Sequence, residues 1–339
     1  MNQPIKTGLL AFGMSGRIFH APFLNANPNF SLDAVAERNT KKAAQIYPNI
    51  KSYDTLEEVI NHPDLELIVI NTPNYTHFEL AKAALLAGKH VLIEKPIAAT
   101  SAEAKELFDL GREVNREVLI YQNRRWDSDV KAVKQVLETG ELGKIVEVHF
   151  RYDRWRPEIG PKAFKETPMP ASGLLYDLGP HLLDQAIDLF GKPLSYTKTL
   201  GKFRHKTEVP DYFFIHLKYP EDLNVFLYAS MLVANPLPGF VVNGSRGTFI
   251  KKRSDVQEAQ LDQGMSPLAV GFGVEEPGME GELTCINSET NKMETTLVPS
   301  LKGDFMGIFD AVYHSIRERK PFPITEEEVL LQLAIIEEN

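Results

Sequence analysis

Residues 90–96 of the chain read His90-Val-Leu-Ile-Glu-Lys-Pro96. The first four residues are typical of a short buried strand, because apolar and β-branched side chains stand between a glycine turn and a polar stop. Ligands of open α/β sheets bind at the carboxyl ends of the strands. We therefore predict that Lys95 acts on a bound hydroxyl or carbonyl group, with Glu94 positioning it. The alternative is that the two charges mark a solvated strand end, which is a common pattern.

A glycine-containing loop follows an apolar run at the start of the chain. Ile5–Phe12 suits a central parallel strand, and residues 11–16 read Ala-Phe-Gly-Met-Ser-Gly. This matches the dinucleotide fingerprint G-x-G-x-x-G with Ala11 in place of the first glycine. Such a loop points helix N–H groups and the helix dipole at a diphosphate, although a chance glycine turn would look the same. The cofactor contacts predicted from the loop are Phe12, Gly13, Met14, Ser15 and Gly16.

Two charged residues follow the next predicted strand, Ser31–Ala36. Glu37 stands 21 residues after Gly16, where the fingerprint predicts a carboxylate that binds the adenosine ribose of NAD. Arg38 is able to stack on adenine or to grip the extra phosphate of NADP. The two residues favour different cofactors, so the sequence leaves NAD or NADP open, with a slight preference for NAD. A charged strand end without a ligand is the alternative.

Strand-like and helix-like stretches alternate over residues 1–122. Further strands are predicted at Leu67–Asn71 and Val118–Tyr121, and helices at Phe78–Ala87 and Ser101–Asn115. Ser101 is followed three residues later by Ala104, so no capping box is predicted there. This alternation predicts an α/β fold, with a doubly wound parallel sheet forming a dinucleotide-binding domain over residues 1–122.

Three polar or turn-forming residues come directly after the strand at Leu67–Asn71. Thr72, Pro73 and Asn74 are predicted to lie beside the glycine loop and to contact the cofactor. Asn74 is equally suited to the start of the helix that follows.

Residues 123–339 change to a strand-rich pattern. After a helix at Asp129–Glu138, the stretch Ile145–Tyr152 alternates apolar and polar residues, which is typical of a sheet with one solvated face. Later stretches of the same kind are Leu194–Phe203, Tyr212–Tyr219, Val225–Met231, Phe240–Asn243, Thr248–Lys252, Leu283–Asn287 and Met293–Val298. We predict a second, α+β domain with a large, mostly antiparallel sheet, whose open face is an oligomer surface. Closing helices are predicted at Asp304–Arg319 and Glu326–Glu338.

Two polar stretches of the second domain are candidates for a substrate site. In Arg154-Trp155-Arg156-Pro157 aromatic and basic residues alternate, which suits a pocket for a polar ligand, although arginines at a strand end also reach solvent in this way.

The second stretch is Ser172–Asp184. A helix that begins near Tyr176 places Pro180 in its first turn, where the missing N–H costs nothing. Asp177 and His181 are then four residues apart on one face, the arrangement of a general base with an orienting carboxylate. A structural His–Asp pair is the alternative. A metal is not predicted, because no second histidine follows at i+4 and no cysteine lies nearby.

The composition excludes several classes of protein. The chain has 37 basic and 46 acidic residues and a net charge of −9, which argues against nucleic acid or an anionic membrane as a partner. Cys285 is the single cysteine, so no internal disulfide forms. With no signal peptide and no membrane-spanning apolar run, we expect a soluble, cytoplasmic protein.

Taken together, these stretches resemble the family of glucose-fructose oxidoreductase, inositol dehydrogenase and MocA (Gfo/Idh/MocA). The likeness rests on the glycine loop and on three motifs, Asn71–His77, Gly88–Pro96 and Gly173-x-x-x-Asp-x-Gly-x-His-x-x-Asp184. Residues 123–127 and 176–185 look most like the branch that contains NADP-linked scyllo-inositol 2-dehydrogenases. The chain departs from the family pattern at Ala11 in the glycine loop and at Glu37, where an NADP user would prefer a small polar residue.

The resemblance implies a Rossmann domain, a cis Lys95–Pro96 bond and catalytic roles for Lys95, Asp177 and His181. His181 is the general base, Asp177 orients its ring, and Lys95 stabilises the alkoxide during hydride transfer between NAD or NADP and a secondary alcohol. His77, Glu94, Lys95 and Asn123 complete the predicted cofactor contacts. The predicted substrate contacts are Lys95, Arg124, Tyr152, Arg154, Trp155, Asp177 and His181.

The implied partners are a small polyol, sugar or cyclitol and further copies of the chain, as a homodimer or homotetramer through the second sheet. A regulator that binds the cofactor without turnover is the alternative function.

Overall fold

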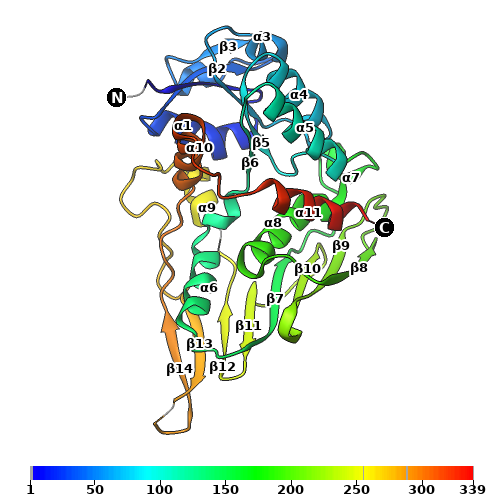
Figure 1. The fold of residues 1–339 in the computed structure, drawn as a ribbon, viewed down its shortest axis with the longest axis vertical. Coiled ribbons are helices and arrows are strands. Elements are labelled where there is room, and N and C mark those ends of the chain that lie inside the picture. Colours follow the sequence, from blue (N-terminus) through cyan, green and yellow to red (C-terminus); the bar gives the residue numbers. More distant parts are fainter. Residues whose placement is uncertain (1–2, 255, 288, 339) are drawn as a thin grey trace.

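The protein is built around two β-sheets, one above the other (Figure 1). The computed structural model describes residues 3–254, 256–287 and 289–338. The first sheet is wholly parallel and has the strand order β3-β2-β1-β4-β5-β6. Its strands are β1 (Ile5–Leu9), β2 (Phe30–Ala36), β3 (Lys51–Tyr53), β4 (Leu67–Ile70), β5 (His90–Glu94) and β6 (Val118–Tyr121). The predicted doubly wound sheet is thus confirmed, and its order reverses between β1 and β4, where open α/β sheets bind their ligands.

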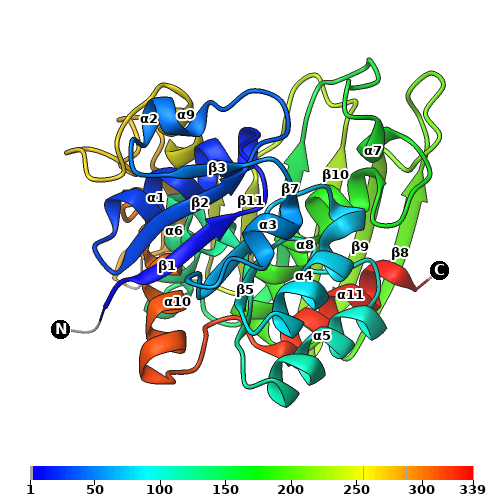
Figure 2. The same cartoon turned by 90° about the horizontal axis from the view of Figure 1, so that it is seen from above.

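Helices cover both faces of the parallel sheet (Figure 2). The segments between its strands are a π-helical turn, η1 (Gly16–His20), the 3₁₀ turn η2 (Asn74–Thr76) and the helices α1 (Ala21–Ala26), α2 (Ala43–Ile46), α3 (Leu56–Ile60), α4 (His77–Leu86) and α5 (Ser101–Glu113). A capping box does start α5, with Thr100 as N-cap and Glu103 as its partner. The prediction of none was wrong because it took Ser101, one residue later, as the cap.

The second sheet has eight strands in the order β14-β13-β12-β11-β7-β10-β9-β8. Only β7 and β10 pair in parallel among its described strands, so the sheet is mostly antiparallel, as predicted. The strands are β7 (Ile145–Asp153), β8 (Ser195–Gly201), β9 (Tyr212–Lys218), β10 (Asn224–Ser230), β11 (Phe240–Gly244), β12 (Gly247–Lys251), β13 (Gly281–Ile286) and β14 (Met293–Val298). Further helices and 3₁₀ turns of this region are η3 (Asn123–Trp126), α6 (Ser128–Thr139), α7 (Ala163–Glu166), η4 (Pro220–Asp222) and α9 (Val256–Asp262).

A long helix, α8 (Gly173–Phe190), packs on one face of the second sheet. It begins three residues before the predicted start, so Pro180 lies inside the helix and not in its first turn. Leu174, Leu175 and Leu178 are all buried in the core of the second sheet. Burial of these apolar side chains stabilises the turns that precede the proline.

The last two helices return to the first sheet. In α10 (Met306–Glu318), Ile308, Phe309 and Val312 join the buried cluster that contains β1, α1 and β4. α11 (Glu326–Glu337) packs between α5 and α8 (Figure 1). The contacts of residues 305–336 therefore cross the predicted division after residue 122. None of the described helices is long and apolar enough to cross a membrane.

Candidate active site

The glycine loop lies at the carboxyl end of β1 and leads into η1. A Cβ atom at Gly13 would meet no atom within 4 Å, whereas one at Gly16 would lie 2.1 Å from the carbonyl oxygen of Ala11. Gly16 is therefore required by close backbone packing, and Gly13 leaves an open space above its backbone. These are the roles of the second and third glycines in a diphosphate-binding loop, so the loop fits a dinucleotide.

Asn71, at the end of β4, holds the loop in place. Its side chain accepts a hydrogen bond from the Ala11 N–H at 3.0 Å and donates one to the Ala11 carbonyl at 2.8 Å. With these two hydrogen bonds, the Asn71 side chain satisfies the backbone N–H and carbonyl of Ala11 in place of a neighbouring strand. They fix the backbone before Gly13. Asn71 was not among the predicted site residues, although it opens one of the family-like motifs.

Glu94 joins the glycine loop to the end of β5. It accepts hydrogen bonds from Ser15 Oγ at 2.6 Å and from His20 Nε2 at 2.9 Å. Burial alone would raise the pKa of Glu94, but these contacts outweigh it and lower the pKa to about 2. Glu94 and Lys95 also interact through their charges, which lower the pKa of Glu94 and oppose the fall in the pKa of Lys95. The positioning of Lys95 by Glu94 stays a prediction.

A hollow of about 370 Å³ lies between the glycine loop and the ends of β2 and β4. It contains six of the predicted cofactor contacts, namely Phe12, Gly13, Glu37, Arg38, Thr72 and Pro73. Its other walls include Leu10, Ala36, Thr40, Lys42, Leu56, Tyr75, Thr76 and Leu80. The size and position suit the adenosine end of a dinucleotide.

The Glu37 carboxylate is nevertheless engaged within the protein. It accepts hydrogen bonds from the N–H groups of Lys42 and Ala43, at 2.9 and 3.2 Å, and from Ser52 Oγ at 2.7 Å. This differs from the expectation of a carboxylate that is free to bind a ribose.

His77 and Asn74 organise the loop after β4. The ring nitrogens of His77 lie 2.7 and 2.9 Å from the carbonyl oxygens of Pro96 and Thr72, and the ring is fully buried. His77 thus ties this loop to the end of the Glu94-Lys95-Pro96 segment, a position different from the expected direct contact with the cofactor. Asn74 donates to the Ala171 carbonyl at 3.1 Å.

Lys95, which directly follows β5, contacts Asp177 on α8. Lys95 Nζ donates to the backbone carbonyl of Asp177 at 2.7 Å and lies 3.5 Å from its Oδ1. Lys165 Nζ contacts the same Oδ1 at 2.5 Å, and Arg154 Nη1 lies 3.9 Å from Oδ2. Burial would raise the pKa of Asp177, but the cations, Lys95 first, hold it far below its usual range. Asp177 is therefore a permanent anion shared by three cations.

His181 lies one turn along α8 from Asp177. The ring is buried, and its Nδ1 has no hydrogen-bond partner among the described residues. Burial, followed by the charges of Lys95 and Arg124, holds the pKa of His181 well below 6.5. The ring is therefore neutral at neutral pH and available to accept a proton.

The expected hydrogen bond between Asp177 and His181 is not formed. The carboxylate turns toward Lys95 and Lys165 instead, because two ammonium groups attract it more strongly than a neutral ring.

Comparison with known proteins decides the family. Residues 5–122 match the model of the oxidoreductase family with an NAD-binding Rossmann fold, and residues 130–250 match the GFO/IDH/MocA C-terminal domain. The chain belongs to the Gfo/Idh/MocA oxidoreductase family. As a member, it is an NAD(P)-dependent oxidoreductase.

Several Gfo/Idh/MocA relatives match over nearly the whole chain. The scyllo-inositol 2-dehydrogenase (NADP(+)) IolW of Bacillus subtilis is 34% identical over 333 residues, which cover 98% of this chain and 92% of the relative. An uncharacterized oxidoreductase of Schizosaccharomyces pombe is 38% identical over 352 residues, covering 98% and 96%. The solved structure of the oxidoreductase YvaA from Bacillus subtilis superposes with a TM-score of 0.92 at 34% identity, covering 98% and 94%. The cis Lys95–Pro96 bond that the resemblance implied is present.

The remaining predicted residues of this Gfo/Idh/MocA protein divide into buried and exposed positions. Arg124 is buried and donates to Glu258 Oε2 at 2.6 Å. Tyr152 is buried beneath the guanidinium groups of Arg154 and Arg253, which lie 4.9 and 4.5 Å from its ring centroid. Trp155 is 57% exposed.

Two more of the predicted cofactor contacts, Asn123 and Met14, differ in their exposure to solvent. Asn123 is buried at the start of η3, and Met14 is 47% exposed on the glycine loop.

Lys165 and Glu258 are contacts of the site that the sequence did not single out. Lys165 lies in α7, 12 residues before its partner Asp177, and Glu258 lies in α9, 134 residues after its partner Arg124.

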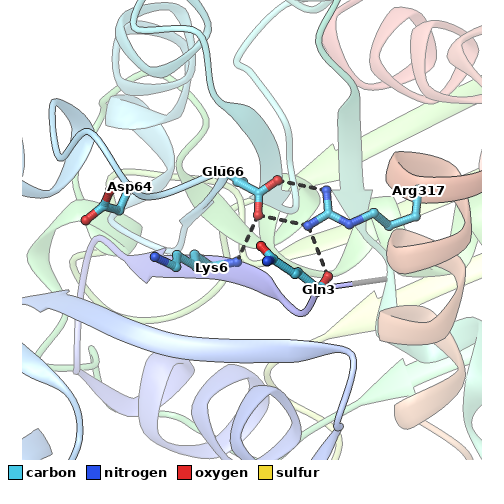
Figure 3. Close-up of a pocket in the computed structure, with 5 residues that line it drawn as sticks. All are labelled: Gln3, Lys6, Asp64, Glu66 and Arg317. Carbon is cyan, nitrogen blue, oxygen red and sulfur yellow. Dashed lines mark hydrogen bonds and ion pairs between the residues drawn. The ribbon is translucent and has the colours of Figure 1, made fainter. Parts of the chain in front are cut away.

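A second hollow, of about 490 Å³, lies at the amino ends of β1 and β4, opposite the glycine loop (Figure 3). Two of its charged groups are paired: both terminal nitrogens of Arg317 lie 2.8 Å from the Glu66 carboxylate. Figure 3 shows this pair beside Gln3 and Lys6. The contact fastens α10 to the first sheet, so this hollow is a structural junction.

Proposed function

We propose that the protein transfers a hydride between a nicotinamide cofactor and a secondary alcohol or carbonyl group of a sugar or cyclitol such as scyllo-inositol. The observation that carries the proposal is the contact of Lys95, which directly follows β5, with Asp177 on α8, one helical turn before His181. The names of relatives add support, since one is a scyllo-inositol 2-dehydrogenase and another, 30% identical over 204 residues, is a levoglucosan dehydrogenase.

The bound nicotinamide supplies the hydride acceptor, and the protein supplies proton transfer and charge. His181 accepts the hydroxyl proton of the substrate as general base, since its ring is neutral at neutral pH. The Lys95 ammonium hydrogen-bonds the same oxygen and stabilises its developing negative charge. Asp177 holds Lys95 in place through its carboxylate and its backbone carbonyl. In carbonyl reduction the same groups act in reverse.

The test is a panel of cyclitols, hexoses and pentitols with NAD and with NADP, followed by nicotinamide absorbance. We expect turnover with at least one neutral polyol and none after replacement of Lys95 by Met. Binding of either cofactor without turnover of any polyol would instead favour the regulator that the sequence left open.

We also propose that the protein assembles as a homodimer or homotetramer through the second sheet. Strand β10 alternates buried residues, which pack against α8, with partly exposed ones on the other face. That other face carries packed rings: the Phe214 centroid lies 6.0 Å from Phe226 and 4.9 Å from Tyr228. Such an aromatic face is typical of a protein–protein interface.

A further inference from the structure

The Asp177 carboxylate has more cationic partners than it can neutralise. Lys95 and Lys165 both contact its Oδ1, at 3.5 and 2.5 Å, and Arg154 Nη1 lies 3.9 Å from its Oδ2. One of these cations would balance the charge of the carboxylate. The three cationic side chains are at most 32% exposed, so water screens their mutual repulsion incompletely. A surplus of positive charge is therefore held beside the catalytic groups.

Lys165 is held at this position by the residue that follows it. Glu166 binds Arg204 at 2.7 Å, and Arg204 in turn binds Asp211 at 3.1 Å. These three side chains are largely buried. The anchor fixes α7 independently of the Lys165 ammonium group, so the contact of Lys165 with Asp177 is not what keeps α7 in place.

Lys162 and Arg156 add positive charge near Lys165. Burial lowers the pKa of Lys162, and the charges of Lys165 and Arg156 lower it further. Each of these cations thus opposes the protonation of its neighbour. An anion bound among them would relieve that repulsion.

Arg253 adds another positive charge near His181. Its guanidinium carbon lies 4.5 Å from the ring centroid of Tyr152, and its Nη2 lies 3.5 Å from Gln185 Oε1, one turn after His181 on α8. Among the residues that the structure describes, Arg253 forms no ion pair with an acid. Positive charge therefore lies near His181 both at Asp177, one turn before it, and at Gln185.

The sign of this local charge is opposite to that of the whole molecule, which has a net charge of −9. A cleft lined by charges of one sign attracts ligands of the other sign. Arg154 and Lys165 belong to the second domain, whereas the loop that fits a dinucleotide diphosphate lies in the first. Their charges are therefore available to the substrate.

We propose that the substrate is an anionic sugar or cyclitol, whose carboxylate or phosphate group binds Arg154 and Lys165 while its reacting hydroxyl lies at Lys95 and His181. Guanidinium and ammonium groups both form charge-assisted hydrogen bonds with such anions. Because Lys95 and Lys165 contact the same carboxylate oxygen, the anionic group belongs on a carbon close to the reacting one. This inference rests on the proposed function and adds the substrate class to it.

The experiment is calorimetric titration of the protein loaded with reduced nicotinamide cofactor, which prevents oxidation of an alcohol. The probes are glucuronate, galacturonate and gluconate, each beside its uncharged amide, and inositol 1-phosphate beside inositol. Contacts with two cations predict that at least one anion binds about tenfold or more tightly than its neutral counterpart. The carboxylate and phosphate probes show which anion the site takes. A panel in which no anion reaches this ratio would overturn the proposal.

Two variants assign the anion site to its residues. Lys165→Gln and Arg154→Gln should each lower the anion-to-neutral affinity ratio by about threefold or more, with the affinity for the neutral probe nearly unchanged. Lys165→Arg keeps the charge and should keep most of the ratio. Lys144→Gln, which removes an exposed positive charge elsewhere in the second domain, is the matched control and should leave the ratio unchanged. A ratio that neither Gln variant alters would overturn the proposal.

Hydride transfer is then measured with the same probes and oxidised cofactor. A preference for the anion in binding without any change in nicotinamide absorbance would count against the proposed function and leave the anion site standing. A kcat/KM for the neutral compounds that equals or exceeds that of their anionic counterparts would overturn the present inference and leave the proposed function intact.

Discussion

The imidazole of His181 lies among positive charges that oppose its protonation. Lys95, Arg124 and Arg253 all lower its pKa, and burial lowers it further than any of them. Asp177 acts in the other direction, but its charge is shared with three cations. A general base in this environment stays deprotonated in mildly acidic solution.

The pH dependence of alcohol oxidation should follow from this environment. The active form of His181 is neutral, and its pKa is below 6.5, so kcat/KM should remain level as the pH falls through 6.5 and decline only at lower pH. The pKa of Lys95 is lowered from 10.5, mainly by burial, so the alkaline decline should begin below 10.5. An acid limb at or above pH 6.5 would contradict the assignment of His181 as base.

Replacing His181 by Ala should lower kcat by about 10²–10⁴, the usual effect of losing a general base. Cofactor affinity should stay within a few-fold, because no described contact joins this ring to the glycine loop. His314→Ala, which removes a partly exposed ring on α10, is the control and should leave kcat unchanged. A His181→Ala protein with nearly normal kcat would show that the proton goes elsewhere.

At the scale of elements, the two glycines of the first loop should respond differently to the same added methyl group. Gly16→Ala places Cβ 2.1 Å from a backbone oxygen that Asn71 holds, so the melting temperature should fall by several degrees. Gly13→Ala meets no atom within 4 Å, so its stability should be unchanged while dinucleotide affinity falls at least tenfold. Thermal unfolding and calorimetry on both variants check this pair. Equal affinities for wild type and Gly13→Ala would remove the loop from the cofactor site.

The strands were the most predictable elements. Val118–Tyr121 is β6 to the residue, because four apolar side chains between polar turns leave few alternatives. β3 and α2 went unrecognised, since they have three and four residues and largely exposed side chains. The position of β3 depends on its pairing with β2, and the start of α2 depends on hydrogen bonds to Glu37. The hydrophobic pattern of such short segments does not predict them.

The site was predictable in its residues and less so in its contacts. Lys95, Asp177 and His181 could be named from motifs, and the structure brings the first two within 3.5 Å. The partner of Asp177 could not be foreseen, because Lys165 lies on a separate short helix whose position depends on the whole second domain. The hydrogen bond that Glu37 accepts from Ser52 could not be predicted either. A carboxylate at a strand end does not indicate which residue of the neighbouring strand will donate to it.

For the whole molecule, a charge on the outer face of the second sheet should prevent assembly. Phe226 stands among Phe214, His149 and His216 on that face, and Phe226→Glu would bury a carboxylate in any interface formed there. Light scattering after gel filtration should show an oligomer for the wild type and a monomer for the variant. Leu86→Glu, at a 64% exposed position on α4, is the control. A monomeric wild type would contradict the proposed assembly.

The return of α10 to the first sheet has a consequence for synthesis on the ribosome. Phe305, Ile308, Phe309 and Val312 complete the cluster around Ile5, Phe23 and Leu67. The dinucleotide-binding half is translated by residue 122, yet this cover emerges about 200 residues later, after roughly 10–40 s at ordinary elongation rates. Throughout that interval one face of the nascent sheet is without a large part of its apolar cover. The growing chain is therefore expected to need a holding chaperone, and a premature stop before α10 should yield an aggregating fragment, not a smaller folded protein.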